Sequence, residues 1–192
     1  MGLFSNLFSA KPQQKATPKQ IELPPTDFTV IDLETSGLDP WKHDILEIGA
    51  LKYRNNKEIN RFHSYVLPKN TIPREATRIN GIDLFTVLKA PPFSQLQDKF
   101  LGFIGNDTIV GYNVNFDIRF VQSHSHLILD NSQYDVLNFV KAVSPNEQNY
   151  KLENLRYKYR LSGTAHSALG DCEATVQLMQ LFADQIRKKS SP

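Results

Sequence analysis

Hydrophobic positions predict strands in the first part of the folded chain and mostly helices after it. Apolar or alternating runs predict four strands, at 28–34, 45–53, 59–67 and 108–112, with a hairpin turn at 54–57. Apolar residues at helical spacing predict helices at 73–79, 93–104, 116–129, 136–143, 152–159 and 167–188, and a helical turn at 83–88. Strands followed by helices that alternate with short strands are typical of an α/β fold with a central mixed sheet flanked by helices.

The first 26 residues differ in composition from the rest. A short apolar patch at 2–8 is followed by a stretch rich in Lys, Gln and Pro that ends in Pro24-Pro25. Such a composition is typical of a flexible linker. We therefore predict a flexible tail over 1–26 and one folded domain over 27–189. The apolar patch leaves two alternatives, docking on a partner or covering the domain's own surface.

Composition and charge restrict the class of protein. No apolar run approaches the ~20 residues of a membrane span, and the only cysteine, Cys172, fits a reducing compartment, so we predict a cytoplasmic protein without a membrane partner. The first 25 residues hold three lysines and one glutamate, which accounts for the whole net charge of +2. The neutral remainder is not a broad electrostatic clamp for duplex DNA, although bound metals would add positive charge locally.

The strand at 28–34 carries two carboxylates near its end. Side chains on a strand alternate faces, so Asp32 and Glu34 point the same way while Ile31 and Leu33 point toward a core. Two ionised carboxylates side by side on one face destabilise the fold unless cations neutralise them, which favours a divalent-metal site. The alternative is a strand end that runs into solvent through an ordinary turn at 34–37.

Two further acidic positions follow along the chain. Asp117 lies in the first turn of a predicted helix, directly after a buried strand, and Asp171 lies in the early turns of the last helix with His166 just before it. The alternative for each aspartate is that it only complements a helix dipole. We expect His124 and His126 to be exposed helix residues without such a context.

Together these positions supply four carboxylates and one titratable base. Four carboxylates suit two hard cations such as Mg²⁺ or Mn²⁺. Two such cations roughly 4 Å apart can activate a water molecule and stabilise the leaving oxygen of a phosphodiester. A histidine is suited to take the proton of that water. The set therefore predicts metal-assisted phosphodiester hydrolysis.

Three ordered motifs also carry a family resemblance. Asp-x-Glu-Thr at 32–35, Asn-x-x-Phe-Asp at 113–117 and His-x-Ala-x-x-Asp at 166–171 resemble the motifs of the DEDDh superfamily, the DnaQ-like 3′→5′ exonucleases. This superfamily includes the proofreading epsilon subunit of bacterial DNA polymerase III. The segment at 73–82 is also similar, and the resemblance covers about residues 27–187. It implies an RNase H-like fold with the carboxylates at the end of the central strand.

The resemblance implies a role for each site residue. Asp32, Glu34 and Asp171 would hold the metal that activates water, Asp32 and Asp117 would bridge to a second metal, and His166 would be the general base. A pocket for the 3′-terminal nucleotide would be formed by Thr35, Gly37, Leu38, Ile79, Asn80 and Phe116. For Leu38 and Phe116 the alternative is ordinary core packing. Many relatives have histidine where this chain has Tyr112 and Asn80, which leaves strand preference open.

Three functions follow from these observations. The first is a metal-dependent 3′→5′ exonuclease that acts on single-stranded or frayed DNA ends and releases nucleoside 5′-monophosphates, with a proofreading role like that of epsilon. The second is the same chemistry on RNA. The third is a non-catalytic adaptor that binds a DNA polymerase or replication protein through the tail. A segment at 177–182 loosely resembles peptides that bind sliding clamps, but its helix is expected to pack in the core.

Overall fold

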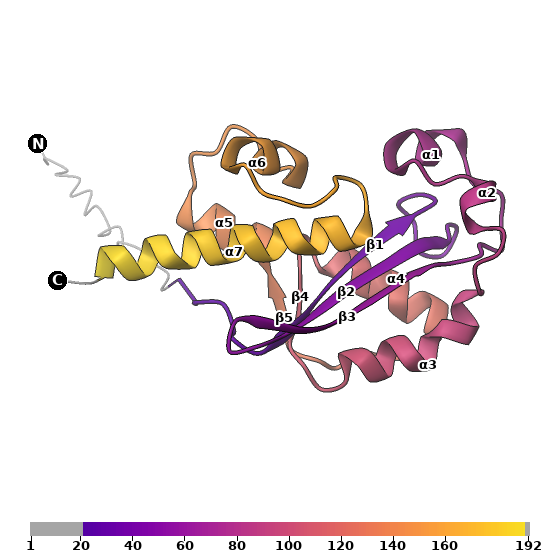
Figure 1. The fold of residues 1–192 in the computed structure, drawn as a ribbon, viewed down its shortest axis with the longest axis horizontal. Helices are drawn as coiled ribbons and strands as arrows, with labels where there is room; N and C mark the ends of the chain where they lie inside the picture. The colour runs from indigo at the N-terminus through magenta and orange to yellow at the C-terminus, as the bar shows by residue number, and fades with distance from the viewer. Residues whose placement is uncertain (1–20, 191–192) are drawn as a thin grey trace, which may run out of the picture.

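A computed structural model describes residues 21–190 of the chain, and its centre is a five-stranded mixed sheet (Figure 1). The strands are β1 (Phe28–Thr35), β2 (Ile45–Arg54), β3 (Lys57–Tyr65), β4 (Ile109–Gly111) and β5 (Gln133–Asp135). Their order in the sheet is β3-β2-β1-β4-β5. β1, β2 and β3 form an antiparallel meander, whereas β4 pairs parallel to β1 and β5 parallel to β4. β1 is therefore the central strand, as predicted.

Seven helices surround this sheet in the described part of the chain. They are α1 (Arg74–Asn80), α2 (Leu84–Val87), α3 (Phe93–Ile104), α4 (Asn115–Ser125), α5 (Val136–Val143), α6 (Leu152–Tyr159) and α7 (Ala168–Ser190). One core cluster joins Ile31 and Leu33 of β1 to α3 and α4, and the other joins Phe28 and Val30 to α5, α6 and α7. Alternate side chains of β1 thus pack in two cores, one on each face of the sheet. The predicted α/β fold is confirmed.

Two details of the prediction are wrong. β5 was not predicted, because three residues, two of them polar, are too short for an alternating pattern to be recognised. The helix predicted at 116–129 ends at Ser125, because His126 adopts a left-handed conformation (φ 57°) and its N–H caps the carbonyl of Gln122. Leu127 and the residues that follow it therefore continue as a loop.

The last helix packs in the core as expected. Leu178, Met179 and Phe182 are at most 1% exposed and belong to the cluster with β1 and α5. The segment that resembles a clamp-binding peptide is therefore part of the core, as expected. No helix among the described residues is both long enough and apolar enough to cross a membrane.

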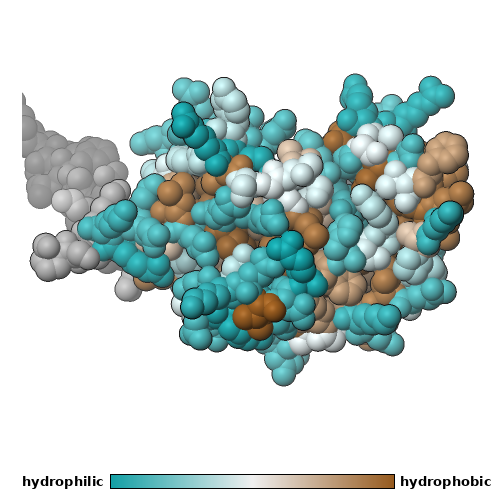
Figure 2. Space-filling model, in the orientation of Figure 1, coloured by the Kyte–Doolittle hydropathy of each residue, from teal (hydrophilic) through white to brown (hydrophobic). Residues whose placement is uncertain are grey.

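α2 turns most of its apolar side chains outward. Leu84 and Phe85 of α2 and Leu88 directly after it are 56%, 87% and 56% exposed, and apolar side chains are visible among polar ones at the end of the molecule where α2 lies (Figure 2). Val87 alone points inward, where it packs with Leu46 and Ile82 in a small third cluster. Val87 is thus the one buried residue of α2.

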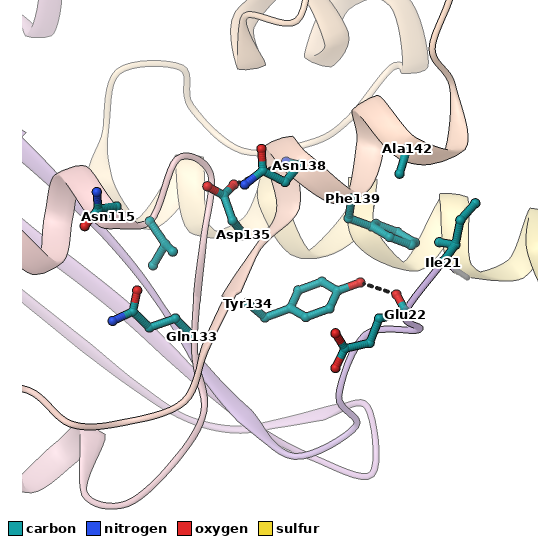
Figure 3. Close-up of a pocket in the computed structure, with 10 residues that line it drawn as sticks. Ile21, Glu22, Asn115, Gln133, Tyr134, Asp135, Asn138, Phe139 and Ala142 are labelled. Carbon is teal, nitrogen blue, oxygen red and sulfur yellow. Dashed lines mark hydrogen bonds between the residues drawn. The ribbon is translucent and has the colours of Figure 1, made fainter. Parts of the chain in front are cut away.

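Residues 21–25 lead into β1 along the edge of the sheet. The Tyr134 hydroxyl of β5 donates a hydrogen bond to the carbonyl of Glu22 (2.9 Å), beside a cavity of about 500 Å³ (Figure 3). Most of the predicted tail, with its apolar patch, lies outside the described residues. The boundary between tail and domain stays a prediction.

Candidate active site

The structure brings three of the four predicted carboxylates directly together. Asp32 and Glu34 lie at the end of β1, and Asp171 lies in the first turn of α7. One oxygen from each of these three side chains lies within 4.8 Å of the other two. Asp171 is far from Asp32 and Glu34 in the sequence, so the cluster depends on how α7 packs against the sheet.

The start of α7 is fixed against β2. Gly49 pairs with Asp32 across the sheet, and a side-chain carbon at Gly49 would collide with the backbone of Ala168. Glu47 then accepts a hydrogen bond from the Ala168 N–H at 3.3 Å. A helix can approach the strand this closely only at glycine, and this approach carries Asp171 to the end of β1.

Asp117 approaches the cluster from the opposite side of the sheet. It is 3% exposed, lies in the first turn of α4, and accepts a hydrogen bond from the N–H of Leu33 (3.0 Å). β4 pairs with β1 only through Thr29 and Val30, so β4 does not cover β1 at Leu33. Complementing the dipole of α4 is therefore not the only role of Asp117. Its carboxylate also binds the backbone N–H of Leu33, which lies between Asp32 and Glu34 in β1.

The carboxylates destabilise one another in their charged forms. Burial, and then the charge of Asp117, raises the pKa of Asp32 well above its ordinary value. Burial, followed by the charges of Asp171 and Glu47, raises the pKa of Glu34 to about 8. Burial also raises the pKa values of Asp117 and Asp171. Mg²⁺ and Mn²⁺ prefer carboxylate oxygens as ligands, and a bound cation would offset the negative charge of these side chains. The residues therefore fit such cations.

The raised pKa of Glu34, which is caused first by burial and then by neighbouring charges, predicts how stability depends on pH. Between about pH 4.5 and 8, folded Glu34 holds a proton that the unfolded chain releases, so its contribution to stability is full below about pH 4.5 and is lost as pH rises through about 8. In EDTA we expect the Tm of the wild type to fall relative to that of Glu34→Gln between pH 5.5 and 8.5. Equal pH dependence of the two proteins, measured by scanning calorimetry, would contradict this.

Bound cations should restore the stability that the wild type loses as pH rises. At a Mg²⁺ or Mn²⁺ concentration 100 times Kd, binding contributes about 2.7 kcal/mol, which corresponds to a rise in Tm of about 5–10 °C for a chain of this size. The same addition to Glu34→Gln should give a clearly smaller rise, because one charged ligand is missing.

His166 lies at a cleft that Asp171 of the acidic cluster also lines. It occupies the loop before α7 in a left-handed conformation (φ 57°), and its side chain is 40% exposed, with Nε2 4.0 Å from an oxygen of Glu153. His166 and Asp171 both line a cavity of about 550 Å³, together with Arg78, Ile79 and Lys151 among others. The cleft therefore combines acids, an accessible imidazole and basic side chains.

Residues predicted to bind a terminal nucleotide surround the end of β1. The Thr35 hydroxyl donates to the carbonyl of Gly37 (2.7 Å), and the Asn80 side chain donates to the carbonyl of Thr35 at 3.4 Å. Leu38 and Ile79 are 84% and 59% exposed. Core packing is therefore excluded for Leu38, and both apolar side chains are available to a ligand.

Two other residues predicted to bind the nucleotide, Phe116 and Gly37, also pack against other parts of the domain. Phe116 is half-buried and packs on the α3–α4 core, with its ring 4.9 Å from that of Phe120, so core packing accounts for part of its role. Gly37 has no room for a side chain because the ring of His43 lies against it.

Sequence reasoning missed the role of Glu47. It is 3% exposed, lies opposite Glu34 in the β1–β2 register, and binds the ring of His63 at 2.7 Å. The available signal was an acidic residue within an otherwise apolar strand. Arg156 was missed too, and it forms an ion pair with Asp171.

The expectation for His124 is wrong. Its side chain is 11% exposed, and its Nε2 lies 3.8 Å from a carboxylate oxygen of Asp44. Its ring also stacks on Phe120. Burial lowers the pKa of His124. Its contacts with Asp44 and Phe120 make it a packing residue beside the β1–β2 loop. His126 is exposed but terminates the helix.

Comparison with known proteins agrees with this geometry. The family model RNase_T, described as exonuclease, matches residues 29–179. The chain belongs to this exonuclease family. The predictions that it is a DnaQ-like exonuclease, and hence an enzyme, are confirmed.

Two relatives and one solved structure illustrate the similarity. The DNA polymerase III subunit epsilon of Rickettsia conorii is 35% identical over 168 residues, which cover 78% of this chain and 72% of that protein. The PolC-type DNA polymerase III of Caldanaerobacter subterraneus subsp. tengcongensis is 31% identical over 166 residues, which cover 84% of this chain. The match spans only 12% of that polymerase's length.

The fold itself matches that of solved exonucleases. Escherichia coli Exonuclease I in complex with a dT13 oligonucleotide has a TM-score of 0.74 and 20% identity over 86% of this chain and 42% of that chain. The RNase H-like exonuclease fold implied by the sequence motifs is therefore confirmed.

Proposed function

We propose that the chain is a metal-dependent 3′→5′ exonuclease that removes nucleoside 5′-monophosphates from single-stranded or frayed DNA ends. The observation that carries this proposal is the convergence of Asp32, Glu34 and Asp171 within 4.8 Å, with Asp171 lining the same open cleft as His166. Water attack on a phosphodiester needs cation ligands and a base at one place, and this arrangement supplies both.

Each residue has a role that its position supports. Asp32, Glu34, Asp117 and Asp171 would hold two divalent cations, Mg²⁺ or Mn²⁺. Cations bound there would supply activation of water and stabilisation of the leaving oxygen. His166, exposed at the cleft, would take the proton of the attacking water.

The surroundings of the cluster favour binding of a strand end. Leu38 and Ile79 would contact the terminal base, because apolar contact with a base tolerates any sequence. Asn80 and the backbone at Thr35 and Gly37 would hold the 3′ end, with Asn80 already bonded to Thr35. Arg78 and Lys151 at the cavity would face the phosphates.

DNA is proposed as the substrate because the relatives are a PolC-type DNA polymerase III and a DNA polymerase III subunit epsilon. A polymerase or replication protein would be the partner, bound through residues 1–26, and proofreading would be the role. RNA as the substrate is the alternative. The neighbourhood of Asn80 is where a 2′-hydroxyl would be distinguished, since Asn80 binds the backbone of the β1 end.

The test is cleavage of matched 5′-labelled DNA and RNA oligonucleotides with Mg²⁺ or Mn²⁺, and with EDTA. We expect a metal-dependent ladder that shortens from the 3′ end, faster on DNA than on RNA. A phosphorothioate at the last linkage should delay the first product if digestion starts there. Faster digestion of RNA would select the exoribonuclease. No cleavage by folded protein of either substrate would contradict the proposal and favour the adaptor.

A further inference from the structure

Arg156 connects two segments that both belong to the candidate active site. It lies in α6, is 9% exposed, and its guanidinium donates hydrogen bonds in two directions. Nη1 donates to the carbonyls of Ser162 (3.1 Å) and Gly163, in the loop before α7. Nη2 donates to the carbonyl of Gly170 (3.1 Å) and to Oδ1 of Asp171, in the first turn of α7. One side chain thus fastens the loop to the helix.

The loop and the helix are in direct backbone contact around this guanidinium. A side chain at Gly163 (φ 95°) would meet the backbone of Gly170 and the guanidinium itself, and a side chain at Gly170 would meet the backbone of Thr164. Two residues after Thr164, the same loop presents His166. The position of His166 therefore depends on the packing that Arg156 holds together.

A contribution to folding stability does not by itself explain why Arg156 is buried against Asp171. A buried guanidinium is expensive to desolvate, and removing its partners from water adds to that cost. Among the side chains that the structure describes, those of residues 21–188, Nε of Arg156 is the one buried nitrogen or oxygen without a hydrogen-bond partner. A planar guanidinium also fixes the orientation of the carboxylate that it binds, more than a lysine would. With Oδ1 held by Arg156, one oxygen of Asp171 is left for a cation.

We propose that Arg156 is a positioning residue for both Asp171 and His166. It holds the Asp171 carboxylate so that one oxygen joins those of Asp32 and Glu34, and it fixes the loop that carries His166. The inference rests on the proposed function, in which Asp171 is a cation ligand and His166 the base. Its role is geometric, since Arg156 is held by backbone carbonyls and by Asp171.

The first test measures Mn²⁺ binding without nucleic acid, by electron paramagnetic resonance, on the full chain. The variants are Arg156→Met, Arg156→Lys and the control Arg160→Met, which removes an exposed arginine from the end of α6. We expect about 10–100-fold weaker Mn²⁺ binding for Arg156→Met, a smaller loss for Arg156→Lys, and wild-type binding for the control. If Arg156 were only a counter-charge, its removal would tighten Mn²⁺ binding, and that result would overturn the inference.

The second test separates positioning from a general loss of stability. Arg156→Met should lower kcat on a single-stranded oligonucleotide by about 10–100-fold at saturating Mn²⁺, with KM within about threefold of the wild-type value. In a His166→Asn background the same substitution should lower kcat by a clearly smaller factor than in the wild type, because one of the two groups that Arg156 positions is gone and only the effect on Asp171 remains. Additive losses, or full wild-type values for Arg156→Lys, would overturn the inference.

The two proposals fail in different ways. A folded wild-type protein that cleaves nothing contradicts the proposed function, while Mn²⁺ binding still tests Arg156. A wild type that cleaves, with Arg156→Met equal to it in Mn²⁺ affinity and kcat, contradicts only the role of Arg156. If Arg156→Met does not fold, Arg156→Lys keeps the charge and carries the same comparison.

Discussion

Replacing Asp32 with asparagine is expected to abolish hydrolysis and, in EDTA, to raise Tm. Asp32 is the carboxylate common to both predicted cation sites, and losing about 4 kcal/mol of transition-state stabilisation lowers a rate by about 10³-fold. The stability gain has a separate cause. Burial and the charges of Asp117, Asp171 and Glu34 raise the pKa of Asp32, so its ionised form is destabilised in the folded protein. A neutral amide of the same shape removes that repulsion.

The measurements are single-turnover cleavage at saturating Mn²⁺ and calorimetry at pH 8 with and without the cation. Asp32→Asn should lose most of the Mn²⁺-induced rise in Tm along with its activity. Asp98→Asn, at an exposed position of α3, is the matched control and should behave as the wild type. A variant at Asp32 that kept more than about a tenth of the wild-type rate would remove this residue from the reaction.

Replacing His166 with asparagine is expected to lower kcat by about 10²–10⁴-fold, the usual effect of losing a general base. Asparagine is preferred to alanine because His166 has a φ of 57°, a conformation that asparagine tolerates well. The imidazole is 40% exposed at the cleft and lies outside the three-carboxylate cluster. Mn²⁺ affinity and the Mn²⁺-induced rise in Tm should therefore stay close to the wild-type values, unlike those of Asp32→Asn.

The chain offers a close control for this substitution. His126 is also exposed and has the same φ of 57°, but it terminates α4. His126→Asn should keep the wild-type kcat. If His166→Asn cleaved as fast as the wild type across the neutral pH range, His166 would not be the base, and another proton acceptor at the cleft would have to be sought.

Much of the fold was predictable because it depends on local patterns. The alternation along 28–34 assigned Asp32 and Glu34 to one face of a central strand, and the structure has two cores on the two faces of that strand. β5 escaped prediction because three residues carry too little pattern. The early end of α4 escaped because a left-handed histidine, rather than the usual glycine, terminates it.

The candidate site was also predictable in part. The sequence by itself determined which residues are available, namely two carboxylates on one strand face, an aspartate in each of two first helical turns and a histidine before the last helix. Only the tertiary structure decided that they meet, because Gly49 lets α7 approach β2 closely enough to bring Asp171 to Asp32. It also decided the neighbours, since Glu47 faces Glu34 through strand register and Arg156 reaches Asp171 from another helix. Periodicity reports the face on which a side chain lies, whereas a contact between distant segments depends on how whole elements pack.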